Sequence, residues 1–167
     1  MSIRESSSVT RITLAVIMER TALHNRWASE RWEAKGVVRD ETPAGAGSRV
    51  IVDSGDTLQV LFPGCEVRLQ RHEAEGYYLN LTSPQPKVFV LWRMQEDGTP
   101  RPELLTVSYN EGTRWADSGE QVDGVALPTE LVPWIAGYVE AHYEPEPPKQ
   151  KRYATNRDKG RMGRVES

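Results

Sequence analysis

The alternation of apolar and polar positions predicts a protein built mainly from β-strands. The clearest stretch is residues 67–95. Within it, residues 77–81 (YYLNL) place apolar side chains at every second position, which is the period of a half-buried strand. Residues 88–92 (VFVLW) are apolar throughout, which is typical of a strand covered on both faces. Because Pro84 and Pro86 cannot donate backbone hydrogen bonds, we expect the two strands to form a central hairpin that turns there.

Further runs along the chain have the composition of strands and are separated by turn sequences. Residues 53–56 (DSGD) and 96–100 (EDGTP) have the composition of turns, and we expect Pro63-Gly64 to end the strand before it. The additional strands are expected at residues 10–20, 32–38, 49–52, 57–61 and 104–109.

Two helices are expected after the last of these strands. Asn110 is a good N-cap and Gly119 a good stop for a short first helix. The second helix is expected to start near residues 128–130, with Pro133 in its first turn. We expect it to cover the apolar strand at residues 88–92. Its apolar stripe recurs at helical spacing through Leu131, Trp134, Ile135, Tyr138 and His142.

These elements predict a single domain of the α+β class: a mostly antiparallel sheet, or partial barrel, capped by C-terminal helices. A chain of 167 residues has the size of one domain. We expect the domain to span residues 10–145, between a disordered N-terminus at residues 1–9 and a disordered basic tail at residues 146–167. No run of about 18 apolar residues predicts a membrane span. The first residues lack the apolar segment of a secretion signal, so a cytoplasmic location is expected.

Charge is distributed unevenly along the chain. The net charge is −3, but residues 149–167 hold seven Lys or Arg and two Asp or Glu, which makes +5 there and leaves −8 for residues 1–148. A basic tail can bind nucleic acid through its phosphates. However, Tyr153 is the only aromatic residue in this tail and the body is acidic. The pattern therefore favours a solvated tail, or one that docks on an acidic protein, over nucleic-acid readout.

The residues that usually carry chemistry are sparse. Cys65 is the only cysteine, which excludes a disulfide and a cysteine metal cluster within one chain. His24, His72 and His142 are not at local metal-binding spacing, and no glycine-rich phosphate loop or G-x-S-x-G motif occurs. Cys65 with a distant histidine would make a nucleophile, but no local motif supports one. We therefore predict no catalytic residue, metal ion or cofactor.

Trp27 is the candidate anchor for a partner. It lies in a polar segment between Arg26 and a Ser-Glu-Arg run, where an amphipathic ring is suited to a protein interface. A ring folded back as a lid on the sheet is the equally weighted alternative. The candidate partner-binding residues are Arg26, Trp27 and Arg31, with Lys149, Lys151 and Arg152 of the tail.

Several stretches resemble, in their order and spacing, an uncharacterised bacterial family. They are residues 16–20 (VIMER), 25–27 (NRW), 31–33 (RWE), 75–81 (EGYYLNL), 88–93 (VFVLWR), 107–109 (VSY) and 115–120 (WADSGE). The resemblance covers about residues 11–145. The family is a domain of unknown function often encoded beside molybdenum- or tungsten-dependent formate dehydrogenases. Some members are labelled molybdopterin-guanine dinucleotide biosynthesis protein A. The enzyme of that name has a glycine-rich loop after its first strand, whereas residues 21–31 here contain no glycine.

The resemblance implies a non-catalytic accessory protein that assists maturation or assembly of such a formate dehydrogenase. It would bind a subunit of the enzyme or one of its maturation factors. An alternative is a protein that binds or makes the pterin cofactor, which predicts a pocket of converging arginines. A second alternative is a nucleic-acid-binding regulator that uses the basic tail. The arginines expected in the pterin pocket are Arg20, Arg26, Arg31, Arg68 and Arg71.

Overall fold

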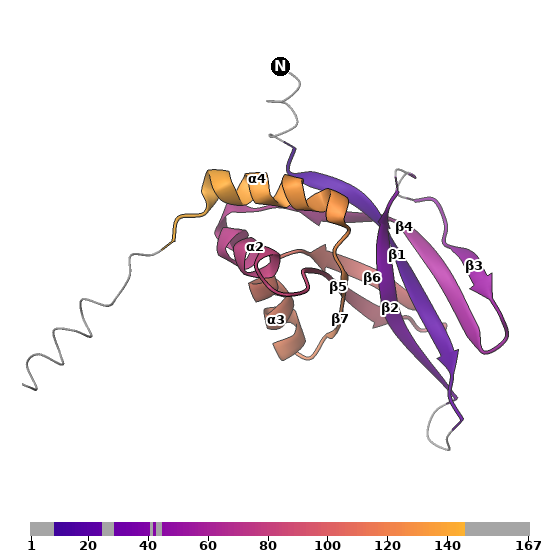
Figure 1. Ribbon diagram of the computed structural model, residues 1–167. Coiled ribbons are helices and arrows are strands. Elements are labelled where there is room, and N and C mark those ends of the chain that lie inside the picture. Colours follow the sequence, from indigo (N-terminus) through magenta and orange to yellow (C-terminus); the bar gives the residue numbers. More distant parts are fainter. Residues whose placement is uncertain (1–8, 25–28, 41, 43–44, 146–167) are drawn as a thin grey trace, which may run out of the picture.

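The computed structural model describes residues 9–24, 29–40, 42 and 45–145, and it shows two antiparallel sheets with three α-helices (Figure 1). The α+β class is thereby confirmed. One sheet has four strands in the order β2-β1-β4-β3, and the other has three in the order β6-β5-β7. In chain order the elements are β1 (Arg11–Ala22), β2 (Glu30–Arg39), β3 (Arg49–Asp53), β4 (Thr57–Arg68), η1 (Arg71–Glu73), α2 (Ala74–Leu81), β5 (Lys87–Met94), β6 (Pro100–Thr106), α3 (Tyr109–Asp117), β7 (Gln121–Ala126), η2 (Thr129–Leu131) and α4 (Val132–His142).

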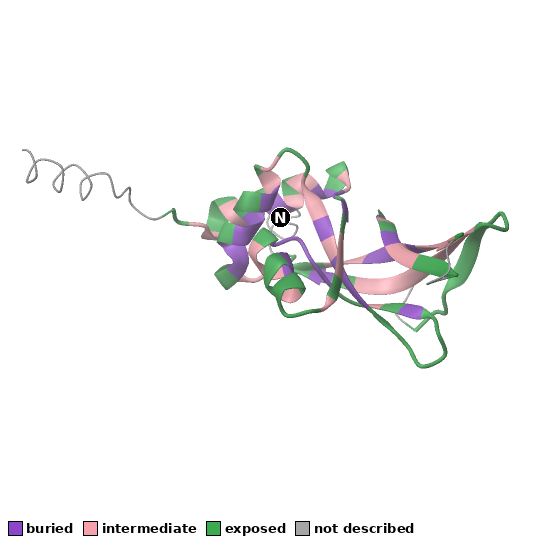
Figure 2. Ribbon diagram, turned by 90° about the horizontal axis from the view of Figure 1, so that it is seen from below, coloured by how far each residue is buried: buried purple, intermediate pink, exposed green. Residues whose placement is uncertain are grey.

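The four-stranded sheet has one face in the core and one end that extends away from it. Leu14, Val16 and Met18 of β1 alternate along the strand and are fully buried, as their period of two predicts. Beyond Met18 the strands continue away from the helices as a projecting end of the sheet, which we call the arm (Figures 1 and 2). The arm consists of residues 19–22, 30–33, 49–53 and 57–60.

β4 passes through Pro63-Gly64 instead of ending there, so that boundary was predicted wrongly. Leu14 of β1 pairs with Cys65 and Val16 pairs with Phe62, which leaves Pro63 and Gly64 as two residues opposite one. Gly64 has a φ of 76°, the left-handed conformation that glycine supplies in a β-bulge. The bulge absorbs the extra residue, and pairing with β1 continues as far as Arg68.

The central hairpin was also predicted wrongly, because residues 74–81 form helix α2. Ala74, Tyr77 and Asn80 are buried and lie three residues apart, which puts them on one face of a helix. The Tyr77 ring packs edge-on against Tyr138 of α4, with 5.9 Å between the ring centroids. Residues 83–86 therefore connect a helix to β5, not one strand to another.

β5 is the middle strand of the second sheet and is covered on both faces, as its apolar run predicts. Val88 and Val90 are fully buried in the core shared with the first sheet. On the other face Phe89 lies against α3, so closely that a Cβ on Gly112 would come within 2.6 Å of its ring. α4, which was expected to cover this strand, packs chiefly on α2, and Ile135 contributes to the same core.

The strands on either side of β5 differ from the expected ones. The strand predicted at residues 104–109 is β6, which begins four residues earlier, at Pro100, and ends three residues earlier, at Thr106. β7 was not predicted at all, since QVDGVA contains no apolar run. Asp123 of β7 connects the sheets: one carboxylate oxygen accepts hydrogen bonds from the backbone N–H of Ala34 and from Nε1 of Trp92, both at 2.9 Å.

The C-terminal helices follow the predicted course. Ser108, not Asn110, caps α3, since its Oγ accepts a hydrogen bond from the backbone N–H of Glu111 at 3.0 Å. Gly119, with a φ of 93°, follows the helix as predicted. Pro133 occupies the first turn of α4. In the described part of the chain no helix is long and apolar enough to cross a membrane.

Candidate functional site

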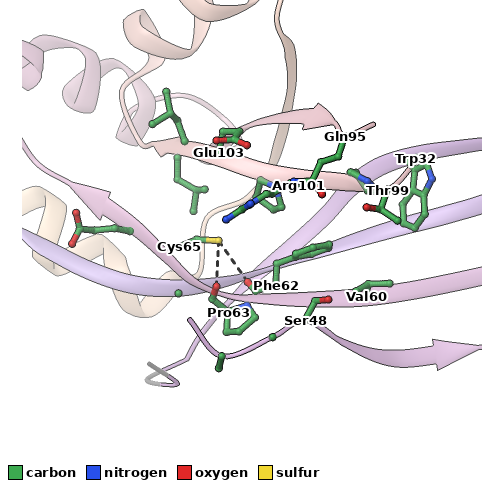
Figure 3. Close-up of a pocket in the computed structure, with 18 of the residues that line it drawn as sticks. Trp32, Ser48, Val60, Phe62, Pro63, Cys65, Gln95, Thr99, Arg101 and Glu103 are labelled. Atoms are coloured by element: carbon green, nitrogen blue, oxygen red, sulfur yellow. Dashed lines mark hydrogen bonds between the residues drawn. The ribbon is translucent and has the colours of Figure 1, made fainter. Parts of the chain in front are cut away.

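A groove of about 1230 Å³ opens between the first sheet and β6 (Figure 3). Its floor is the inner face of β4 and the arm, and its opposite wall is residues 100–105. The turn at residues 95–99 and the segment at residues 45–48 contribute to its rim. The apolar residues of the floor are Trp32, Val50, Leu58, Val60, Phe62 and Cys65.

Strand register explains why these side chains gather on one face. Arg20 of β1 lies opposite both Trp32 of β2 and Leu58 of β4. Val60 of β4 lies opposite Val50 of β3. Residues directly opposite one another in an antiparallel pair project to the same side, so each row places its side chains in the groove. The floor therefore forms only when the strands pair, because its side chains come from β2, β3 and β4.

The groove opens beside an exposed apolar edge. β3 is the edge strand of the sheet, and all five of its residues are exposed. Val50, Ile51 and Val52 have 56%, 41% and 40% of their surface exposed. An apolar strand at a sheet edge is normally shielded by charge, proline or a covering segment. Here Val50 belongs to both β3 and the groove floor, so the apolar surface of the floor continues onto the exposed strand.

The groove carries charges of both signs. Arg68 forms an ion pair with Glu66 at 3.0 Å, and Arg20 lies 3.8 Å from Glu30 and over the Trp32 ring. Arg101 extends from β6 into the groove toward Cys65 (Figure 3). The charged residues that line the groove are Arg20, Arg68 and Arg101, with Glu66, Asp97, Glu103 and Glu111. This mixture does not make a site for a polyanion.

Cys65 is a neutral thiol in this setting. Its Sγ donates to the carbonyl oxygen of Phe62 at 3.5 Å. Burial raises the pKa of Cys65 to about 11, although a hydrogen bond with the backbone of Val16 and the charge of Arg101 oppose the rise. A thiol with so high a pKa is a poor nucleophile near neutral pH. In the described chain, no histidine lines the groove to act as its base.

The model of a protein family, described as protein of unknown function (DUF3305), matches residues 13–152. The chain belongs to this family. The match includes every lining residue of the groove, so the groove is part of the DUF3305 domain. No curated protein and no solved structure matches the chain.

Most of the predicted partner contacts of this DUF3305 protein lie outside the described residues. These are Arg26, Trp27, Lys149, Lys151 and Arg152. Arg31 is described: it lies on β2, is exposed, and has its guanidinium 3.7 Å from the carboxylate of Glu33. It does not line the groove. The role of Trp27, as anchor or lid, stays a prediction.

The four described arginines of the expected pterin pocket are not brought together, and the fifth, Arg26, lies outside the described residues. Arg20 and Arg68 both line the groove, but Arg20 lies opposite Leu58, ten positions from Arg68 along β4. That separation is about 30 Å, which is too far for both to hold one pyrophosphate. Arg71 and Arg31 lie outside the groove lining.

A second polar cluster joins η1 to α3 and is structural. The carboxylate of Glu73, 3% exposed, accepts a hydrogen bond from the Ser108 hydroxyl at 2.6 Å and one from Arg114. His72 is 3.8 Å from the same carboxylate. Although serine, histidine and a carboxylate meet here, the hydroxyl donates to the carboxylate and not to the imidazole, so nothing activates it. Within the described residues no three His, Cys, Asp or Glu are placed to hold a metal ion.

Proposed function

We propose that this DUF3305 protein is a non-catalytic accessory protein that binds a partner polypeptide in the groove. The observation that carries the proposal is the apolar floor that runs on to the exposed strand β3 through Val50. Apolar surface rimmed by polar residues marks protein interaction sites. The groove volume of about 1230 Å³ also exceeds the roughly 300–1,000 Å³ of a small-molecule pocket.

The proposed partner is a subunit of a molybdenum- or tungsten-dependent formate dehydrogenase, or one of its maturation factors. This part of the proposal rests on the sequence resemblance. The groove favours a polypeptide over the pterin cofactor, since its arginines are dispersed along about 30 Å of strand. It likewise does not favour nucleic acid, because four carboxylates line it beside three arginines.

The proposal is tested by affinity capture with tagged, full-length protein in cells that make the formate dehydrogenase. The bound fraction is assayed for the enzyme's subunits and maturation factors by quantitative mass spectrometry. Val50→Asp places a charge on the apolar floor, and we expect at least a fivefold loss of the captured component, about 1 kcal/mol. Val38→Asp is the matched control, because Val38 is 40% exposed at the opposite edge of the same sheet and outside the groove.

Two results would contradict the proposal. In the first, folded wild-type protein captures no formate dehydrogenase component. In the second, it captures one equally well with Val50→Asp and Val38→Asp. Purification of the protein with a bound pterin nucleotide would instead favour the cofactor-binding alternative.

A further inference from the structure

Arg101 is the groove arginine that has no carboxylate partner among the described residues. Arg20 and Arg68 each lie within 4 Å of a glutamate, at 3.8 and 3.0 Å. The side chain of Arg101 forms no ion pair or hydrogen bond with any described residue. Its electrostatic neighbour is the neutral thiol of Cys65. Arg101 is therefore the groove arginine whose guanidinium is open to a carboxylate of a partner.

Arg101 is exposed, and both apolar and polar side chains line the groove near it. Phe62 and Pro63 lie beside Cys65 on β4, across the groove from the strand of Arg101, whereas Thr99 and Glu103 lie on the same side of the groove as Arg101 (Figure 3). A charge beside apolar walls interacts more strongly with a partner charge than one in open water does. The guanidinium group suits a carboxylate in particular, because its planar donors match the two oxygens.

The length of the groove indicates the form of the occupant. The lining residues run along β4 from Leu58 to Arg68, about 30 Å, which accommodates about nine residues of extended chain. In an extended chain, every second side chain points to the same side. A partner side chain that meets Arg101 therefore has its next same-side neighbours two residues before and two residues after it.

Phe62 and then Val60, with Val50 beside it, follow Cys65 in one direction along β4. We infer that the groove binds an extended segment of the partner with the pattern apolar–x–apolar–x–Asp/Glu, read in either chain direction. The acidic side chain pairs with Arg101, and the apolar side chains pack on Val60 and Phe62 of the floor and on Val50 at the edge. This inference rests on the proposed function, since it specifies which part of a partner polypeptide the groove recognises.

The test uses a displayed library of random ten-residue peptides, selected against the full-length protein. We expect the enriched peptides to carry the pattern, and a selected peptide to bind Arg101→Gln about tenfold more weakly than wild type. Arg39→Gln is the matched control, because Arg39 is an exposed strand arginine outside the groove lining. Selection against Arg101→Glu should enrich Lys or Arg at the position where wild type enriches Asp or Glu.

The inference is overturned if selection yields no binder, if the enriched peptides have no acidic preference, or if folded Arg101→Gln binds like Arg39→Gln. Thermal unfolding of each variant establishes that it is folded. The outcome also separates the two proposals. Acidic–apolar binders without capture of a formate dehydrogenase component would remove the proposed partner and keep the inference. Capture that is weakened by Val50→Asp but unchanged by Arg101→Glu would remove the inference and keep the proposed function.

Discussion

Ser108 contacts η1, α2 and α3, and it fits between them because the facing residue of α2, Gly76, has no side chain. Its hydroxyl donates to Glu73 at 2.6 Å and accepts from the N–H of Glu111 at 3.0 Å, so it links η1 to the start of α3. Gly76 of α2 lies directly against it, and a Cβ there would be 2.0 Å from Ser108 Oγ. The side chain of Ser108 is fully buried and cannot rotate away without losing both hydrogen bonds. The close approach of α2 to α3 therefore depends on the absence of one methyl group.

Gly76→Ala should destabilise the protein by about 2 kcal/mol, through overpacking and loss of the cap. Gly137→Ala is the matched control, because Gly137 is also helical but has no atom within 4 Å of an added Cβ. It should gain about 0.5–1 kcal/mol from helix propensity. Urea denaturation followed by circular dichroism measures both free energies of unfolding. Equal effects of the two substitutions would refute the argument from the Ser108 contact.

The Cys65 thiol should be unreactive until the pH is high. Burial raises its pKa to about 11 from an ordinary value of 9.0, so folding favours the protonated form. The contribution to stability is fully present below pH 9 and is lost as the pH rises toward about 11. The rate of iodoacetamide labelling of the native protein should rise with an inflection near 11, and the same protein in urea should show it near 9. A native inflection at or below 9 would show that the thiol is not desolvated.

At the scale of elements, helix α2 shows that the alternation of apolar and polar residues over a short stretch does not determine its secondary structure. Five residues that alternate between apolar and polar fit a strand, but the same residues form a helix because of what its buried face contacts. The side chain of Asn80 donates to the carbonyl oxygens of Lys87 and Val107 and accepts from the N–H of Lys87, with all three distances between 2.8 and 2.9 Å. The Tyr77 hydroxyl accepts from the N–H of Gln70 at 2.8 Å. These partners come from other elements, so short-range periodicity does not contain them.

The longer strands and the last helix were predictable, since each has enough periodic residues of its own. β1 carries four apolar residues on one face, and α4 combines an apolar stripe with a proline in its first turn. The groove was not predictable in the same way, because it joins β4 to a strand about 40 residues later. Arg101, between two prolines, has the composition of a turn. The one available indication was that residues 49–53 and 57–62 are more apolar than two short surface strands require.

In addition to the shared core, the carboxylate of Asp123 joins the two sheets through hydrogen bonds. Asp123→Ala would leave the N–H of Ala34 and the indole N–H of Trp92 without their acceptor. Since each unsatisfied buried donor costs about 1–3 kcal/mol, we expect a total loss of about 2–4 kcal/mol. Asp117→Ala is the control, as Asp117 is exposed at the end of α3. The measurement is urea denaturation, and a loss below about 0.5 kcal/mol would mean that the two donors find other acceptors.

At the scale of the whole molecule, the proposed binding groove starts at the core and extends beyond it, since Trp32, Phe62 and Cys65 pack against the core and Val50 does not. The core cluster draws its residues from Leu14 to Ile135, with partly buried neighbours from Ile12 to Val139. The groove floor lies on the arm and on β4 beside it, away from the helices (Figure 2). Residues 149–167 add a charge of +5 to a body of −8. A substitution at Val50 can therefore alter the groove while the core stays intact.

Deletion of residues 149–167 should separate the electrostatic contribution of the tail from the apolar contribution of the groove. The free energy of unfolding should change by less than about 0.5 kcal/mol, because the deletion leaves every residue of the described core in place. Affinity for the captured partner should fall at about 50 mM salt but much less at about 300 mM, where charges are screened over a shorter distance. Val50→Asp should weaken binding by a similar factor at both salt concentrations, since it acts on apolar contact. If the deletion leaves the salt dependence of binding unchanged, the basic tail does not attract the partner through its charge. The groove would then account for the binding alone.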